Sequence, residues 1–354
     1  MPARFETWTS ESQSRHKTGT AMSEQRPRVI FDVMGGDHAP GPMVVGALRA
    51  ARDYGISSLL VGDRAAIEPH LAEGGQERDL IEVAHAGAVI GMDEHPAEAV
   101  RNRPDSSLVR SIELLRDGAG GSTVSLGNSG AIMAAAVLRL RRLPGVRRPV
   151  IASLLRLPGG ATVWMDIGAN ADCDADHLCQ FAQMGEIYAR SELRIERPTV
   201  GLLNMGHEEG KGPQVVRDAA AMIAARGLNF VGNVEPQMML RAEVDVVVAD
   251  GFTMNIAVKT LEALADMIFG TVRDYARSSL RGRLGGMLLR PAFAGLRSQV
   301  DYREIGAAPL LGVNGLVLIG HGRSRERAVV GAIRQADRLT RVDAVSQLAR
   351  AFAP

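Results

Sequence analysis

The sequence predicts an α/β protein with three layers, α/β/α, around a mostly parallel sheet, and with a protruding helical segment. From Arg28 onward, short apolar runs alternate with helix-like stretches, which is the pattern of repeated βα units. Many of these runs are apolar from end to end, as expected of strands that are covered on both faces. With 354 residues, 46% of them hydrophobic, the chain is long enough to bury a large core.

The elements follow one another without an internal repeat or a low-complexity linker, so we expect residues 28–345 to form a single domain. The predicted strands cover residues 29–33, 58–61, 80–85, 123–126, 150–154, 162–167, 200–205, 230–234, 244–249 and 316–319. The predicted helices cover residues 42–54, 106–116, 131–141, 174–189, 215–225, 253–279 and 325–339. Residues 1–27 are predicted to be a disordered polar tail, with Met22 as an alternative start, and residues 346–354 a C-terminal tail.

The composition argues against several classes of protein. A net charge of +1 gives no overall field that would attract nucleic acid. Two cysteines are too few for a disulfide framework in a chain of this size and suit a reducing cytoplasm. The sequence contains no apolar run long enough for a membrane span and no secretory signal. We therefore expect a cytoplasmic protein that does not bind nucleic acid.

Small and polar residues gather where the predicted strands end. These segments are DVMGGDHAPG (32–41), SLGNSGA (125–131), DIGANAD (166–172), NMGHEEGKG (204–212), ADGFTMN (249–255) and GHGRS (320–324). One glycine-rich turn often does no more than turn the chain. Several of them at the carboxyl edge of an α/β sheet predict a ligand site, because ligands bind at that edge.

The chemistry of these segments favours an anion. In SLGNSGA, Gly127 and Gly130 allow close approach of the backbone, and Asn128 or Ser129 can cap the following helix. The N–H groups at the start of that helix would favour a phosphate or a developing oxyanion. The alternative is that Asn128 and Ser129 only cap the helix, and this loop by itself leaves both interpretations open.

Lysine is rare in this chain, which contains only Lys17, Lys211 and Lys259. Lys211 stands between Gly210 and Gly212 in one of the predicted ligand loops. A compact ammonium binds differently from the planar guanidinium that the chain uses elsewhere. A solvated surface charge is the alternative, but the scarcity of lysine and the glycine frame favour a role in anion binding.

In their order and content, these segments resemble the phosphate acyltransferases of bacterial phospholipid synthesis, the PlsX family. The runs that carry the resemblance are VIFDVMGGDHAP, SLGNSGAIMAA, WMDIGANADCDADHLCQFAQMG, VGLLNMGHEEGKG, VVVADGFTMNIAVKTLE and DYREIGAAPLLGVNG followed by IGHG, over residues 28–339. The resemblance implies transfer of a fatty acyl group from the thioester of acyl carrier protein to inorganic phosphate, giving acyl phosphate. It also implies an isocitrate/isopropylmalate dehydrogenase-like fold, a homodimer, and neither a redox cofactor nor a metal.

The resemblance also implies a catalytic pair, Lys211 and Asn255. Lys211 would hold the attacking phosphate, and Asn255 would stabilise the oxyanion at the thioester carbonyl. Because phosphate is already partly a dianion at neutral pH, Asp166, Asp250 and His207 are expected to arrange the site rather than to act as essential bases. The other residues expected to contact substrate are Gly35, Gly36, Asp37, Gly127, Asn128, Ser129, Gly130, Asn170, Gly210, Gly212 and His321.

Some candidates have alternatives that stay open. His321 either contacts ligand or is a core histidine, and Lys259 is a weaker candidate whose alternative is surface pairing with Glu262. In the family pattern, Ser129 stands where threonine is common, His207 stands where a small residue is usual, and Met254 replaces a glycine. The change at Met254 leaves open a different acyl pocket and a specialised acyl chain.

Other functions are weighed against this one. The run CDADHLC (173–179) combines metal-ligand residue types, but its cysteines lie six apart on a predicted helix and are better explained as packing thiols. A nucleotide-dependent dehydrogenase would require a G-x-G-x-x-G turn after the first strand, where VMGGDHAPG stands. A non-catalytic scaffold for the carrier protein would tolerate mutation in the glycine loops.

Residues 261–300 are predicted to form the protruding amphipathic segment. Leu261, Leu264, Ile268, Val272 and Tyr275 recur at helical spacing, which suits a dimer-forming helix. Farther on, the segment becomes basic and apolar, and the residues expected to make contacts there are Arg281, Arg283, Leu288, Leu289 and Arg290. We expect this tip to contact acyl carrier protein or, transiently, the anionic inner face of the cytoplasmic membrane, which would make the protein peripherally associated there.

Overall fold

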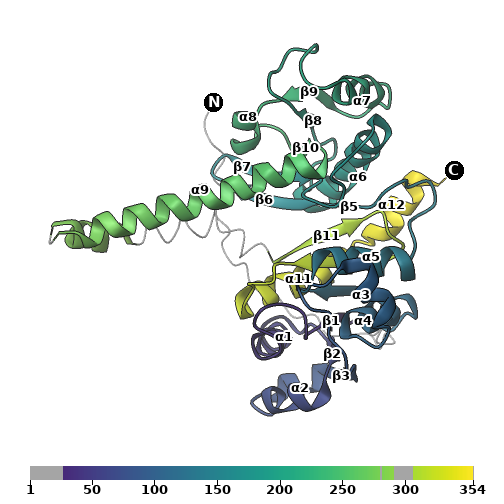
Figure 1. Ribbon diagram of the computed structural model, residues 1–354, viewed down its shortest axis with the longest axis vertical. Helices are drawn as coiled ribbons and strands as arrows, with labels where there is room; N and C mark the ends of the chain where they lie inside the picture. The colour runs from purple at the N-terminus through teal and green to yellow at the C-terminus, as the bar shows by residue number, and fades with distance from the viewer. Residues whose placement is uncertain (1–26, 280, 291–305, 354) are drawn as a thin grey trace, which may run out of the picture.

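The computed structural model describes residues 27–279, 281–290 and 306–353 (Figure 1). The expected N-terminal tail therefore lies outside the described residues apart from Pro27, and so do residues 291–300 of the expected protruding segment. Within the described part the predicted α/β class is confirmed, because mostly parallel strands alternate with helices along the chain.

The first sheet contains seven of the described strands, in the order β3-β2-β1-β4-β12-β11-β5. Their bounds are β1 Val29–Asp32, β2 Ser58–Gly62, β3 Ile81–His85, β4 Ser122–Ser125, β5 Val150–Ile151, β11 Ala307–Leu311 and β12 Val317–Gly320. Strand β11 is antiparallel to both neighbours, and the other pairings in this sheet are parallel. The carboxyl ends of β1, β4 and β12 therefore lie at one edge, together with the amino end of β11.

The second sheet contains five described strands, in the order β6-β7-β10-β8-β9. Their bounds are β6 Ser153–Leu157, β7 Gly160–Met165, β8 Val200–Leu203, β9 Phe230–Val234 and β10 Val246–Val248. Only the pairing of β6 with β7 is antiparallel among them. The strands therefore form two sheets rather than the one mostly parallel sheet that we expected.

The division into two sheets splits a segment that the sequence predicts as one strand, residues 150–154. Residues 150 and 151 pair with β11, whereas Ser153 pairs with β7 in the other sheet. Between them, the N–H of Ala152 donates to the carbonyl oxygen of Pro309 at 3.1 Å. Because the run is largely apolar on both sides of this crossing, its periodicity does not reveal the change of partner.

Helices cover both faces of the first sheet, which gives the predicted three layers. The helices are α1 Gly41–Tyr54, α2 Arg64–Leu71, α3 Pro96–Asn102, α4 Ser107–Arg116, α5 Ser129–Arg139, α6 Ala175–Leu193, α7 Gln214–Ala224, α8 Pro236–Leu240, α9 Gly251–Arg277, α11 Glu326–Arg341 and α12 Ala344–Phe352, with a 3-10 helix at Gln76–Leu80. On β12, Leu318 joins the core that includes residues of α1 and α11, whereas Val317 and Ile319 join the core that includes residues of α4 and α5. Alternate residues of one strand thus enter cores on opposite faces.

Several elements differ from the sequence prediction, which did not include strand β11 or helices α2, α3, α8 and α12. Strand β11 is missed because Pro309 lies inside it, and proline has no N–H to donate to a sheet. The expected C-terminal tail at residues 346–354 is wrong, because residues 344–352 form helix α12. Leu348 and Phe352, one helical turn apart, are buried in the core, and α12 contacts α6 and α11.

Helix α9 projects away from the two sheets, as Figure 1 shows. It closely matches the predicted helix at residues 253–279, and Gly251 and Met254 near its start are its buried residues. Residues 281–290 are also helical. The protruding segment is therefore confirmed over its described part. In the described ranges, every helix is too short or too polar to cross a membrane.

Candidate active site

Glycines allow three loops of the first sheet to approach one another closely. Gly35 follows β1, and a Cβ on it would lie 2.7 Å from the backbone nitrogen of Gly127, which follows β4. Gly36 has a φ of +99°, and a Cβ on it would lie 3.1 Å from the carbonyl oxygen of Gly322, which follows β12. A side chain at either position would push the loops apart. The convergence of these loops at one sheet edge is therefore confirmed.

Hydrogen bonds fix the relative positions of the same loops. The Ser125 hydroxyl donates to Oδ2 of buried Asp32 at 2.7 Å, and the N–H of Gly127 donates to Ser125 Oγ at 3.2 Å. The backbone N–H of Asp37 donates to the carbonyl oxygen of Gly322 at 2.8 Å. We expected Gly35, Gly36 and Asp37 to contact substrate. The loop that holds them contacts both the loop after β4 and the loop after β12.

Asn128 is occupied by structural hydrogen bonds at the start of α5. Its Oδ1 accepts a hydrogen bond from the N–H of Ala131 at 3.1 Å, which caps the helix. Its Nδ2 donates to the carbonyl oxygens of Met92 and Glu94 at 2.8 and 3.1 Å. Ser129, the first residue of α5, lines the cavity described below. The two residues therefore divide the tasks between them, because Asn128 caps the helix and Ser129 faces the cavity.

The buried carboxylate of Asp166 organises the loop after β7. Its Oδ1 accepts hydrogen bonds from the N–H groups of Gly168 and Ala169 at 3.1 and 2.8 Å. Its Oδ2 accepts from the backbone N–H and the Nδ2 of Asn170 at 2.7 and 2.8 Å. The carbonyl oxygen of Asn170 then accepts a hydrogen bond from the N–H of Gly251 at 2.7 Å. Asp166 and Asn170 thus join the loop to the start of α9.

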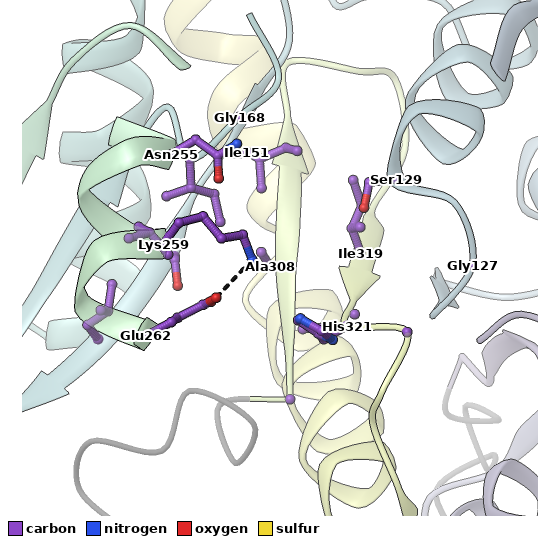
Figure 2. Close-up of a pocket in the computed structure, with 18 of the residues that line it drawn as sticks. Gly127, Ser129, Ile151, Gly168, Asn255, Lys259, Glu262, Ala308, Ile319 and His321 are labelled. Carbon is purple, nitrogen blue, oxygen red and sulfur yellow. Dashed lines mark hydrogen bonds and ion pairs between the residues drawn. The ribbon is translucent and has the colours of Figure 1, made fainter. Parts of the chain in front are cut away.

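Asp250 caps helix α9, which follows β10. Its Oδ1 accepts a hydrogen bond from the N–H of Thr253 at 2.8 Å. One turn farther along, Asn255 lies against Gly168, where a Cβ would stand 3.4 Å from Asn255 Nδ2. Gly168 has a φ of +139°, which also favours glycine. The loop after β7 therefore leaves room for the Asn255 amide (Figure 2).

A cavity of about 400 Å³ lies between these loops of the two sheets (Figure 2). Its polar side chains are Ser129, Ser153, Asn255, Lys259, Glu262 and His321. Its apolar side chains include Ile151, Leu155, Ile167, Val258 and Ala308. In Figure 2, Asn255 and Lys259 extend from α9, and Ser129 and His321 lie on the other side. The cavity can therefore hold an apolar chain beside a polar or charged group.

His321 is a neutral histidine at the cavity. Burial lowers the pKa of His321, and the charge of Lys259 lowers it further. Its Nδ1 accepts a hydrogen bond from the N–H of Arg323 at 3.2 Å, so the proton of the neutral ring is on Nε2. The side chain of His321 lines the cavity.

Lys211 lies on the loop after β8 and is not among the residues that line the cavity. Its side chain is exposed, and its carbonyl oxygen accepts a hydrogen bond from Asn204 Nδ2 at 3.0 Å. His207, Gly210 and Gly212 belong to the same loop and also lie outside the cavity lining. In the second sheet, β8 lies beyond β10 and is two strands away from β7.

Comparison with known proteins shows the family. The family described as "Fatty acid synthesis protein" matches residues 28–347. A phosphate acyltransferase from Anaeromyxobacter sp. is 45% identical over 327 residues, which are 92% of this chain and 91% of the relative. One from Myxococcus xanthus is 46% identical over 311 residues, 86% of this chain and 88% of the relative. The chain belongs to the phosphate acyltransferase family.

Solved structures of more distant proteins share the fold. A phosphotransacetylase from Streptococcus pyogenes gives a TM-score of 0.60 at 16% identity, covering 91% of this chain and 95% of its own. A 4-hydroxythreonine-4-phosphate dehydrogenase from Klebsiella pneumoniae gives 0.51 at 12% identity, covering 89% and 99%. At these identities the likeness concerns the fold alone, and it agrees with the predicted α/β class.

Met254, which precedes Asn255, is not among the residues that line the cavity. It is fully buried in a core cluster with Trp164 and Val247, beneath the start of α9. Its backbone is helical, so the position does not require the positive φ that only glycine adopts easily. The expectation that Met254 changes the acyl pocket therefore finds no direct contact to support it.

The run CDADHLC is explained by helix capping and packing. Asp174 and His177 form a capping box at the start of α6: Asp174 Oδ1 accepts from the N–H of His177 at 2.9 Å, and His177 Nδ1 accepts from the N–H of Asp174 at 3.2 Å. Burial raises the pKa of Cys173 to about 12 and also raises the pKa of Cys179. In the part of the chain that the structure describes, no group of histidine, cysteine and carboxylate side chains is arranged to hold a metal ion.

Sequence reasoning missed much of the cavity wall. Ile151, Leu155 and Ala308 lie on strands that it merged or did not predict, and it treated Glu262 only as a surface partner of Lys259. One signal was available, because Asn255 and Lys259 are four residues apart and therefore share a face of their helix. The apolar members carried no such signal, since a core residue and a wall residue look alike in sequence.

Proposed function

We propose that the protein transfers a fatty acyl group from the thioester of acyl carrier protein to inorganic phosphate, giving acyl phosphate for phospholipid synthesis. Membership of the phosphate acyltransferase family supports acyl transfer to phosphate. In this chain, the supporting observation is one cavity that combines an apolar wall with Ser129, Asn255 and His321. An acyl thioester and an anionic acceptor require both kinds of surface.

The reaction needs a donor for the oxyanion more than it needs a base. A phosphate oxygen attacks the thioester carbonyl carbon, the carbonyl oxygen becomes negative, and the C–S bond then breaks to release the carrier thiolate, which takes up a proton. Phosphate is largely anionic at neutral pH, so it attacks without a strong base. Asn255 lines the cavity, and its side-chain N–H is the donor that we assign to the oxyanion.

The other side of the cavity suits the phosphate. Ser129 can donate its hydroxyl proton, and the amino end of α5 carries the positive end of the helix dipole. The neutral imidazole of His321 offers an N–H at Nε2. These groups can bind an anion directly.

Lys211 does not line the cavity, and it enters the proposal as a second, exposed lysine that attracts phosphate from the loop after β8. Asn204 and Asn233 hold this loop, because their Nδ2 atoms donate to the carbonyl oxygens of Lys211 and Glu208 at 3.0 and 2.8 Å. A backbone hydrogen bond lowers the pKa of Glu208, and the nearby charge of Lys211 lowers it further. The loop is thus a fixed support for one exposed ammonium.

We also propose that the protruding segment contacts other molecules. Helix α9 exposes Leu264, Met267 and Ile268, which suits an interface with a second copy of the chain. Beyond it, Leu288 and Leu289 are 71% and 52% exposed beside the exposed Arg281, Arg283 and Arg290. An exposed surface that is both apolar and basic suits an anionic membrane or an acidic carrier protein.

The direct test combines the purified protein, inorganic phosphate and acyl carrier protein thioesters of several chain lengths. We expect release of carrier thiol that depends on phosphate, and an acyl phosphate that hydroxylamine traps as a hydroxamate. Sulfate at equal ionic strength is the control and should give neither product. Thiol release without phosphate would indicate a thioesterase, and carrier binding without any product would indicate a scaffold. Either result would contradict the proposal.

A further inference from the structure

One lysine reaches the cavity, and it is not the one in the glycine-framed loop. Among the described residues the lysines are Lys211 and Lys259, and only Lys259 lines the cavity. Figure 2 shows its side chain extending from α9 toward Ala308 on β11. The cavity therefore contains an ammonium group that the sequence reasoning had given a minor place.

The position of Lys259 follows from the helix. Asn255, Lys259 and Glu262 are spaced four and three residues apart along α9, so they share one face of it. All three line the cavity. An ammonium on this face stands one helical turn from the amide that we propose as the oxyanion donor.

Glu262 holds the Lys259 ammonium at this place. The distance from Lys259 Nζ to Glu262 Oε2 is 2.8 Å. The side chains differ in exposure: Lys259 is 57% exposed, whereas Glu262 is 15% exposed. An ion pair between two exposed side chains contributes little to stability. Here the carboxylate is partly buried, which an ordinary surface pair does not need. Since an ammonium has three N–H donors, the bond to Glu262 leaves donors that can bind an anion.

The charge of Lys259 also acts across the cavity. It contributes to lowering the pKa of His321, after the larger effect of burial, whereas Glu262 acts in the opposite direction. His321 stands on the far side of the cavity in Figure 2. An anion between the two sides would therefore meet the ammonium on one side and the His321 side chain on the other.

We propose that Lys259 binds the phosphate substrate in the cavity and that Glu262 is a positioning residue which holds its ammonium there. This inference rests on the proposed function and names the group that receives its acceptor substrate. Without its partner, Glu262 would present an unpaired negative charge to the incoming phosphate. The pair therefore couples two effects, attraction by the lysine and neutralisation of the carboxylate.

The test measures the affinity of the protein for inorganic phosphate in two ways. Calorimetry gives the Kd of the free protein, and the acyl transfer assay gives the KM. Lys259→Ala should raise the Kd and the KM for phosphate about tenfold or more, because it removes a charged hydrogen bond, while the KM for the carrier thioester stays near that of the wild type. Arg273→Ala is the matched control, since Arg273 is an exposed cation on the same helix and does not line the cavity. It should leave both phosphate constants unchanged.

The double variant Lys259→Ala/Glu262→Gln tests the coupling. It should bind phosphate about threefold or more tightly than Lys259→Ala, because the unpaired carboxylate has gone. Circular dichroism and the Tm establish that each variant is folded. A purely structural pair would show no such recovery of phosphate affinity.

Each outcome decides the inference separately from the proposed function. If folded Lys259→Ala binds phosphate within about twofold of the wild type, or if the wild type binds no phosphate, the inference is wrong. If phosphate binding is lost in Lys259→Ala but the wild type forms no acyl phosphate from any thioester, the site stands and the proposed function fails. If Lys259→Ala forms acyl phosphate with an unchanged phosphate KM, the function stands and the inference fails.

Discussion

His321 Nδ1 accepts a hydrogen bond from the backbone N–H of Arg323 at 3.2 Å, within the loop that follows β12. This bond requires an unprotonated Nδ1, and burial of the side chain lowers the pKa of His321 below the ordinary value of 6.5. The folded protein therefore keeps the ring neutral at neutral pH, with an N–H on Nε2 at the cavity.

The first prediction concerns stability against pH. As pH falls through about 6.5, His321 is protonated in the unfolded chain before it is protonated in the folded chain. The free energy of unfolding therefore decreases on acidification. His321→Gln removes this contribution, and its free energy of unfolding should decrease less than that of the wild type between about pH 7.5 and pH 5.5. Urea unfolding at both pH values measures the difference. Equal pH dependence in the two proteins would show that His321 titrates normally.

The second prediction concerns the proposed oxyanion donor. Asn255→Ala should lower kcat about 100-fold or more, because loss of one preorganised donor costs that much in comparable sites. The KM for phosphate should change little, since Asn255 is assigned to the thioester oxygen. Thr271→Ala, an exposed polar residue of the same helix far from the cavity lining, is the control. If kcat decreases by less than about threefold, Asn255 is not the oxyanion donor.

The third prediction concerns Lys211. If its compact ammonium binds phosphate, Lys211→Arg should lose most activity although the charge is kept, because a guanidinium cannot occupy the same point in the glycine-framed loop. Lys211→Ala should then be about equally impaired. Near-normal rates of Lys211→Arg at saturating phosphate would show that the loop lysine has no specific role.

The fourth prediction is that no acyl-enzyme forms. Both thiols have a raised pKa through burial, that of Cys173 reaching about 12, so neither is a ready nucleophile. The double variant Cys173→Ser/Cys179→Ala should retain most of the wild-type turnover. Mass spectrometry of the wild type with acyl thioester and no phosphate should show the unmodified chain. A stable acylated protein in that sample would contradict direct attack by phosphate.

The fifth prediction concerns the tip of the protruding segment. The wild type should sediment with anionic vesicles at low salt and be released at high salt, because salt screens the attraction between the arginines and the anionic lipids. Leu288→Glu/Leu289→Glu should weaken sedimentation while folding and the proposed dimerisation persist. Leu138→Glu, at a residue of α5 that is 53% exposed, is the control for a new charge elsewhere. If the wild type stays in the supernatant, the tip does not bind membranes and contacts only other proteins.

Much of the fold and part of the site followed from local features of the sequence. The glycine and polar segments at the strand ends do lie at sheet edges, because a parallel strand must be followed by a turn there. Asn128, Asp174 and Asp250 cap their helices through bonds that span only three residues, and such contacts are encoded locally. The helix at residues 253–279 was predictable for the same reason, since its apolar spacing is a property of one segment.

The tertiary structure decided which segments meet. The crossing between the two sheets at Ala152 and the strand that contains Pro309 depend on partners far away in the chain, so neither has a local signal. Asp166, which we expected to arrange the site, accepts hydrogen bonds from the loop after β7, but which segments this loop meets was decided by the tertiary structure.

The two lysines show the same limit. Lys211 had the more suggestive sequence context, yet Lys259 is the one at the cavity. The physical reason is the order of the parallel strands: β10, which leads into α9, neighbours β7, whereas β8 and its loop lie beyond it. That order is fixed by the packing of whole sheets and helices, which the residues around a single lysine do not encode.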